Sequence, residues 1–152
     1  MAITAKVLCA AIIASSGVFG IGGKDRACKH SRQVVKASSK YKLDPYLLTA
    51  LIKVESNWKP HVFSPAGACG LTQVVHKYSK YNCKQLKNPK ISIWEGAKKL
   101  NYWIYKYGKG NVKIGLCGYN AGFRCKGKSA NKKGLTYAKK VVRISNRLKR
   151  RK

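Results

Sequence analysis

The sequence predicts a mainly helical single domain, and three observations support this fold class. Apolar residues recur with helical spacing along residues 45–56, 91–107 and 135–148. No strand pattern of convincing length follows residue 23. A chain of 152 residues with 45% hydrophobic content is long enough to bury a core of its own. We therefore expect one helical domain over residues 24–148, preceded by a distinct N-terminal segment and followed by a short basic tail.

The N-terminal segment, residues 1–23, has the features of an export signal. A single positive charge at Lys6 precedes an apolar run over residues 7–13, and small residues follow at 14–16. The alternative is an uncleaved, weak membrane anchor, because residues 7–23 carry no charge and reach the short end of a spanning length. We predict export, with weak anchoring as the alternative.

The domain begins with two predicted helices. Residues 25–42 form a basic amphipathic pattern that places Cys28, Val35 and either Ser38 or Ser39 roughly on one side. In the second helix, Asp44 is a suitable N-cap and Pro45 suits the first helical position. That helix is expected to run from residue 45 to about residue 56, before Pro60.

Glu55 is the unusual residue of the second helix. It follows Leu48, Leu51 and Ile52 at helical spacing and therefore lies on the buried, apolar face. Burial disfavours an ionised carboxylate and raises its pKa, which suits a general acid near neutral pH. The alternative is that Glu55 meets solvent at the end of the helix and pairs with a lysine.

A glycine-containing loop follows over residues 64–70 and leads into residues 71–75. Gly67 and Gly70 allow positive φ or a close approach of the backbone, either to a ligand or to another helix. A plain connecting loop would contain the same glycines.

The clearest helical pattern in the chain covers residues 91–107, after the turn at Asn88 and Pro89. Its apolar face consists of Ile93, Ala97, Leu100, Ile104 and Tyr107. Glu95 falls nearly opposite this face, with Lys98 and Lys99 three and four residues further on. We therefore expect Glu95 to be solvated and paired with these lysines.

The C-terminal third is expected to contain two more helices. Asn111 is a suitable cap for a short helix that leads to residues 118–122, and a basic loop follows over residues 123–133. The last helix has an apolar face and a cationic one, and residues 149–152 continue as the basic tail. Its apolar face consists of Leu135, Ala138, Val141, Val142, Ser145 and Leu148.

The net charge of +29 points to a polyanionic partner. Nucleic acid, anionic lipid headgroups and bacterial envelope polymers all carry the required charge. Charge alone does not choose among them.

The cysteines agree only loosely with export. Removal of a leader that contains Cys9 would leave an odd number, so we expect at most two disulfides and one remaining thiol, with the pairing open. The remaining residues are Cys28, Cys69, Cys83, Cys117 and Cys125. The three histidines show no ligand spacing relative to these cysteines, and we therefore predict neither a metal site nor a cofactor.

The small number of carboxylates restricts the possible chemistry. Glycosidases usually use two acids, and this chain has only Asp25, Asp44, Glu55 and Glu95. Asp25 adjoins the leader, Asp44 is a helix cap and Glu95 is expected in solvent, so Glu55 alone is placed for catalysis. One carboxylate is sufficient when a hydroxyl of the same sugar acts as the nucleophile and closes a ring without consuming water.

Several motifs in order resemble the soluble lytic transglycosylase family. They are the pair Glu55-Ser56 with residues 57–60 after it, the loop 64–73, the element 88–96 with its Asn-Pro and glycine, and the Gly-Tyr-Asn-Ala-Gly motif at 118–122. Each motif alone is weak, whereas the combination over about residues 41–142 is specific. The resemblance implies a goose-type-lysozyme-like fold.

The family resemblance also implies roles for individual residues. Glu55 would be the catalytic acid and base, Ser64 and Gln73 would line the sugar site, and Tyr119 and Asn120 would orient the sugar. The implied reaction cleaves the MurNAc-GlcNAc bond of peptidoglycan and forms 1,6-anhydroMurNAc. Peptidoglycan glycan strands are therefore the expected partner, with no specific nucleic acid. The N-terminal segment predicts an exported protein (periplasmic, secreted or virion-associated), and the charge predicts attraction to anionic envelope polymers. A monomer is expected, with the oligomeric state open.

Alternatives accompany these roles. Gln73 could satisfy buried backbone groups, Tyr119 could belong to the core and Asn120 could cap a helix or form a turn.

The sequence also departs from the family pattern at Thr72, Gly118 and Lys133, where methionine, alanine and an acidic residue are common. The alternative functions are a hydrolytic muramidase and a non-catalytic basic protein that binds the cell wall or another polyanion. Trp58, Trp94, Tyr102 and Trp103 are candidates for sugar stacking, although core or rim packing is the preferred interpretation.

Overall fold

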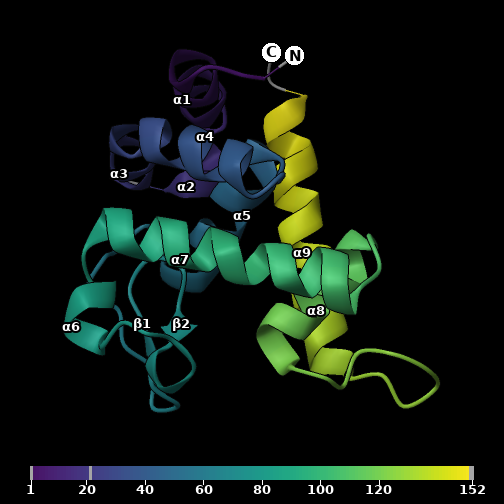
Figure 1. Cartoon of the computed structure of the whole chain (residues 1–152). Coiled ribbons are helices and arrows are strands. Elements are labelled where there is room, and N and C mark those ends of the chain that lie inside the picture. Colours follow the sequence, from purple (N-terminus) through teal and green to yellow (C-terminus); the bar gives the residue numbers. More distant parts are fainter. Residues whose placement is uncertain (1, 21, 151–152) are drawn as a thin grey trace.

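The computed structural model describes residues 2–20 and 22–150 and confirms a mainly helical fold. Residues 1, 21, 151 and 152, which belong to the expected leader and basic tail, lie outside the described residues. Figure 1 shows α7 (Pro89–Asn101) running across the molecule, transverse to the long C-terminal helix α9 (Lys132–Lys149). Above α7 in this view lie the N-terminal helices, and below it lies a small loop-rich layer.

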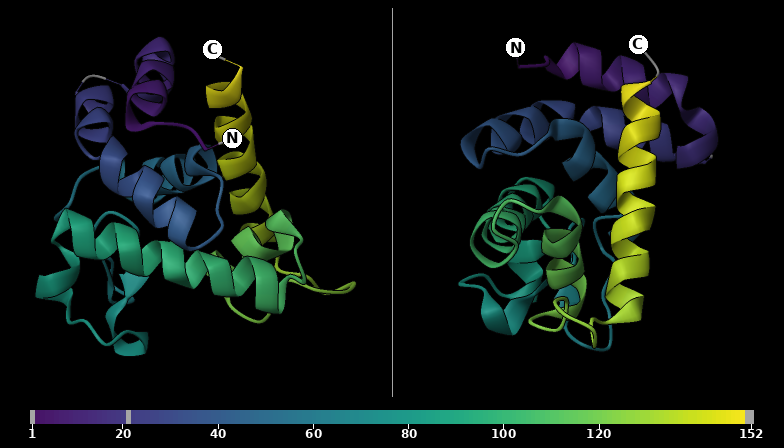
Figure 2. Two further views of the ribbon diagram at one scale, coloured as in Figure 1. Left: turned by 45° about the horizontal axis from the view of Figure 1, so that its top comes forward. Right: turned by 90° about the vertical axis from the view of Figure 1, so that its right-hand side faces the viewer.

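The N-terminal segment forms two helices, α1 (Ala5–Ala14) and α2 (Ser16–Phe19), which pack onto the rest of the chain. Leu8, Ile12 and Phe19 have no exposed surface and belong to the main core. In Figure 2, α1 crosses the C-terminal end of α9. None of the helices in the described part of the chain is both long and apolar enough to span a membrane. Export and weak anchoring both stay predictions.

The expected single helix over residues 25–42 is two helices. They are α3 (Gly23–Lys29) and α4 (Ser31–Lys40), which meet at His30. The buried side of α4 contains Val34 and Ala37, whereas Val35 is only partly buried. The weak periodicity of this basic stretch did not reveal the break.

The helix that carries Glu55 is confirmed as α5 (Pro45–Ser56). Asp44 caps it, because its carboxylate accepts a hydrogen bond from the backbone N–H of Tyr46 at 2.8 Å. Leu48, Leu51 and Ile52 are fully buried. The helix ends at Ser56, as expected, and its C-cap Asn57 adopts a left-handed conformation with φ of 52°.

The loop-rich layer contains a short antiparallel pair, β1 (Ala68–Cys69) and β2 (Val74–Val75). A 3-10 turn (His76–Tyr78) and the helix α6 (Cys83–Leu86) follow. Gly70 permits this layer to pack closely, since a Cβ there would lie 2.0 Å from the carbonyl oxygen of Leu86. Its φ of +80° also favours glycine.

The predicted apolar face of residues 91–107 is buried, as expected, but this segment forms two helical elements and not one. The α-helix α7 passes into a π-helix, η2 (Tyr102–Tyr107). Ile93, Ala97 and Leu100 are fully buried, and Ile104 is 2% exposed. Asn111 caps α8 (Val112–Ala121), as predicted, and the 118–122 motif forms the end of this helix. The loop after α8 extends to Asn131, which caps α9.

The prediction for Glu95 is wrong. Glu95 is 5% exposed and accepts a hydrogen bond from the hydroxyl of Ser79 at 3.1 Å. The physical reason is that α7 is covered on two sides, by α4 and by the loop-rich layer (Figure 1). Periodicity identified the apolar side, whereas the second side is covered by a polar loop that leaves no apolar signal.

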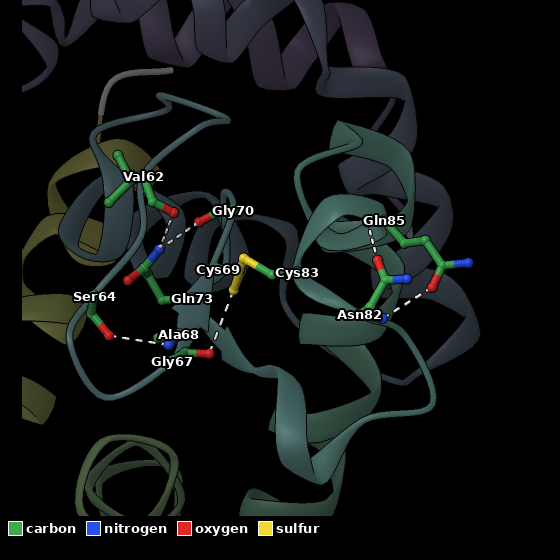
Figure 3. The surroundings of a disulfide bond; sticks show 10 residues. All are labelled: Val62, Ser64, Gly67, Ala68, Cys69, Gly70, Gln73, Asn82, Cys83 and Gln85. Atoms are coloured by element: carbon green, nitrogen blue, oxygen red, sulfur yellow. Dashed lines mark hydrogen bonds between the residues drawn. A yellow bond between two sulfur atoms is a disulfide. The ribbon is translucent and has the colours of Figure 1, made fainter.

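All six cysteines are paired in the full chain. The expected two disulfides and one thiol applied to a chain without its leader, and that form stays a prediction. Cys9 bonds Cys28, so a residue of the expected leader takes part in a disulfide. Cys69 bonds Cys83 and ties β1 to α6, as Figure 3 shows. Cys117 bonds Cys125 and ties α8 to the loop that follows it.

Candidate functional site

Glu55 lies on the last turn of α5, partly buried, where it meets α9. The hydroxyl of Tyr137, on α9, donates a hydrogen bond of 2.7 Å to Glu55 Oε2. Burial raises the pKa of the Glu55 carboxyl to about 7, and the hydrogen bond from Tyr137 partly offsets this rise. A carboxyl with this pKa can both donate and accept a proton near neutral pH.

The lysine partner considered for Glu55 is not found. Among the described residues the salt bridge is the one between Lys149 and Asp44, and it lies at the other end of α5. Tyr137 is a functional candidate that sequence reasoning missed. The signal was weak but present, because Tyr137 precedes Val141 and Leu148 on the apolar side of a helix whose other side is cationic.

Tyr119 lies near Glu55 and close to Tyr137. Its hydroxyl donates a hydrogen bond of 2.6 Å to the carbonyl oxygen of Thr72. Burial, and then the charge of Glu55, raises the pKa of both phenols well above the usual value. Both tyrosines therefore remain hydrogen-bond donors at neutral pH.

Two hollows adjoin this group. The first, which we call the basic cleft, has a volume of about 450 Å³ and contains Glu55. Its lining includes three lysines: Lys53, Lys59 and Lys140. Asn57, Val62 and Ile144 also line it.

The second hollow, which we call the aromatic hollow, has a volume of about 620 Å³. Gln73 and Asn120 line it beside five aromatic rings. These rings are Tyr78, Tyr102, Trp103, Tyr119 and Phe123. A hydrogen bond links the linings of the two hollows, because the side-chain amide of Gln73 donates at 3.0 Å to the carbonyl oxygen of Val62 in the basic cleft.

The structure brings together most of the residues that the sequence nominated. Gln73, Tyr119 and Asn120 line one hollow next to Glu55. Ser64 lines neither, and its hydroxyl accepts a 3.1 Å hydrogen bond from the backbone N–H of Ala68 (Figure 3).

Gln73 has a visible structural role. Its amide nitrogen donates to the carbonyls of Val62 and Gly70, both at 3.0 Å, and holds a backbone with φ of 53° (Figure 3). Satisfaction of backbone groups, the alternative considered for Gln73, is therefore observed. Its placement in the aromatic hollow leaves the carbohydrate role open as well.

The aromatic candidates divide into two pairs. Trp58 is 1% exposed and stacks on His30, and Trp94 donates a 2.9 Å hydrogen bond to Gln33, so both pack between helices. Tyr102 and Trp103 instead line the aromatic hollow. Packing therefore describes the first pair, whereas Tyr102 and Trp103 pack against each other and also line the hollow.

Two departures from the family pattern have a physical reason here. A Cβ at Gly118 would lie 2.4 Å from Trp103 Cε3, so glycine makes room for this indole. The hydroxyl of Thr72 bonds the carbonyl of Ser92 at 2.7 Å, and Gly96 packs directly against Thr72. Lys133 is exposed, and nothing in the structure explains its difference from an acidic residue.

Because Glu95 is buried, exposure to solvent is not a reason to exclude it as a second catalytic acid. It lines neither hollow, however, and its carboxylate is bound by Ser79. No cluster of three or more metal-binding side chains occurs among the described residues.

Comparisons with known proteins identify the family of this chain. The Transglycosylase SLT domain family matches residues 32–142. A membrane-bound lytic murein transglycosylase F from Hahella chejuensis is 36% identical over 75 residues, which are 49% of this chain and 15% of that protein. A transglycosylase of Enterobacteria phage PRD1 is 32% identical over 87 residues, which are 57% of this chain and 32% of that protein.

A solved structure supports the fold. An inactive mutant of the lytic transglycosylase Slt from Pseudomonas aeruginosa superposes with a TM-score of 0.70 at 19% identity, over 80% of this chain and 24% of that one. The chain thus spans a third or less of the length of each of these relatives. Because the family match covers most of the chain, this protein belongs to the Transglycosylase SLT domain family.

Proposed function

We propose that this protein is a peptidoglycan lytic transglycosylase that cleaves the MurNAc-GlcNAc β-1,4 bond and forms 1,6-anhydroMurNAc, with Glu55 as its acid and base. The observation that carries the proposal is the position of Glu55. Its carboxyl, with a pKa of about 7 and a hydrogen bond from Tyr137, lies in the basic cleft beside Tyr119, which lines the aromatic hollow.

The reaction needs one carboxyl group in two states. Protonated Glu55 gives its proton to the glycosidic oxygen, which leaves as the 4-hydroxyl of GlcNAc. The carboxylate then takes the proton of the 6-hydroxyl of the same MurNAc while O6 bonds C1 and closes the anhydro ring. Glu55 ends protonated again, and water is not consumed.

The neighbouring side chains support both states of Glu55. The enclosed position favours the neutral acid before cleavage, and the hydrogen bond from Tyr137 stabilises the carboxylate after it. Gln73 and Asn120 line the aromatic hollow, which supports a role for them in holding the sugar rings. Ser64, which lines neither hollow, is the weakest of the nominated binding residues.

The net charge of +29 fits the same substrate. Bacterial envelopes are polyanionic, and electrostatic attraction would hold an exported monomer on the cell wall. The similarity to a phage enzyme also makes a phage origin part of this proposal.

The test is the chemistry of the sugar ends. Purified peptidoglycan is digested with the full chain, reduced with borohydride and analysed by mass spectrometry. Anhydro ends, which resist reduction and are lighter by one water, are expected. Reducible ends would identify a hydrolytic muramidase, and absence of soluble fragments would identify a non-catalytic wall-binding protein.

A matched pair of variants tests the single-acid mechanism. Glu55→Gln should lower the rate about 10³-fold, because the amide cannot transfer the proton. Glu95→Gln makes the same chemical change at the second buried glutamate, and its amide oxygen can still accept the hydrogen bond from Ser79. We expect Glu95→Gln to retain activity. A folded Glu95→Gln protein without activity would show that the mechanism needs two acids.

A further inference from the structure

Lysines from separate parts of the chain gather at the basic cleft. Lys53 comes from the end of α5, Lys59 from the following turn and Lys140 from α9. Lys53 is held in place, because its ammonium group donates a 2.6 Å hydrogen bond to Asn57 Oδ1. Behind it, Arg26 donates a 3.1 Å hydrogen bond to the carbonyl of Asn57.

These cations have no acidic partner among the described residues. Of the chain's four acids, Asp44 pairs with Lys149, Glu95 binds Ser79 and Glu55 binds Tyr137. Asp25 is exposed and forms no salt bridge. Burial, and then the charges of Lys140 and Arg26, lowers the pKa of Lys53, which indicates an excess of positive charge at this place.

The helix dipole and the high lysine content account for only part of this arrangement. A cation at a helix C-terminus is favoured by the helix dipole, which accounts for Lys53 but not for Lys140 on another helix. A high lysine content accounts for exposed lysines on every face. It does not explain why a partly buried, tethered lysine adjoins two other cations at the hollow that contains Glu55. Such repulsion is relieved when an anionic ligand binds.

The chemistry of the substrate identifies the anion, and this step rests on the proposed function. If Glu55 acts at a MurNAc-GlcNAc bond, the groups next to it belong to these two sugars. MurNAc carries a peptide stem on its lactyl ether, and the free carboxylates of the stem are its anionic groups. We propose that the basic cleft is a subsite for carboxylates of the peptide stem, with Lys53 and Lys140 as its principal ligands.

The experiment removes charge either from the substrate, at the stem carboxylates, or from the protein, at the lysines of the basic cleft. One substrate is peptidoglycan with intact stems, and the other is the same material after its carboxyl groups have been converted to methylamides with carbodiimide. The measured quantity is the cleavage rate on untreated peptidoglycan divided by the rate on amidated peptidoglycan. We expect the double variant Lys53→Gln/Lys140→Gln to lower this ratio about tenfold. The matched control is Lys36→Gln/Lys139→Gln, which removes two lysines that line neither hollow and should keep the wild-type ratio.

A binding measurement separates this inference from the proposed function. Cosedimentation of Glu55→Gln protein with both substrates reports the subsite without catalysis, and the added lysine substitutions should lower the affinity ratio by a similar factor. An unchanged ratio, or the same loss in the control, would overturn the subsite. Absence of anhydro products from wild-type protein would overturn the proposed function alone.

Discussion

The two hollows beside Glu55 differ in chemistry and in origin. The aromatic hollow is mostly built from one part of the chain, since Tyr102, Trp103, Tyr119 and Phe123 lie on η2, on α8 and just after it. The basic cleft joins α5 to α9, and its Lys53 and Lys140 are far apart in the sequence. Rings stack on the apolar faces of sugars, whereas ammonium groups bind anions. Under the two proposals above, the glycan and the peptide of one substrate are recognised in different hollows, and the acid belongs to the basic cleft.

Among the changes that probe this comparison, the largest effect is expected from pH, which acts on the acid in the basic cleft. Glu55 must be protonated to start the reaction, and its pKa is about 7, so kcat/KM should fall about tenfold per unit above pH 7. Amidated glycan is the appropriate substrate, because its binding does not depend on the charge of the basic cleft. Rates measured from about pH 5 to about pH 9 would check this.

Tyr137→Phe provides the control for this assignment. The hydrogen bond from Tyr137 lowers the pKa of Glu55, so its loss should move the descending limb to higher pH. A limb that moves downward, or wild-type activity that already falls at the ordinary pKa of a glutamate, would contradict the assignment of this limb to Glu55.

A medium effect is expected from Phe123→Ala in the aromatic hollow. Phe123 is 70% exposed, and its ring lies 4.8 Å from that of Trp103. Loss of one stacking surface should lower kcat/KM about three- to tenfold. The loss should be equal on untreated and amidated peptidoglycan, unlike that of the lysine variants.

Phe63→Ala is the matched control for Phe123→Ala. Phe63 is also an exposed ring, at 57%, but lines neither hollow, and its removal should leave kcat/KM near the wild-type value. If both variants lose activity equally, or if the loss at Phe123 depends on the stem carboxylates, the division between the two hollows would not hold.

The smallest effect on activity is expected from Gly118→Ala, which alters the aromatic hollow through packing. The added methyl would displace Trp103 and lower the Tm by about 3–10 °C. Thermal unfolding followed by circular dichroism measures this. Gly17→Ala, where nothing lies within 4 Å of the new Cβ, should leave the Tm unchanged or slightly raise it. Equal Tm values for both variants would mean that Trp103 moves without cost.

The sequence by itself determined the local features of this protein. Asp44 and Pro45 fixed the start of α5, and Asn111 fixed that of α8, because caps and the N1 proline act within one turn. The motif order that nominated Glu55 and Gln73 also required no structure.

Only the tertiary structure decided what meets across long separations. The Glu55–Tyr137 hydrogen bond spans 82 residues, and the burial of Glu95 depends on a polar loop that covers α7. The disulfide between Cys9 and Cys28 depends on the packing of α1 against α3. The physical reason is that apolar spacing and caps report a residue's own helix, whereas its neighbours in space are set by how the helices pack.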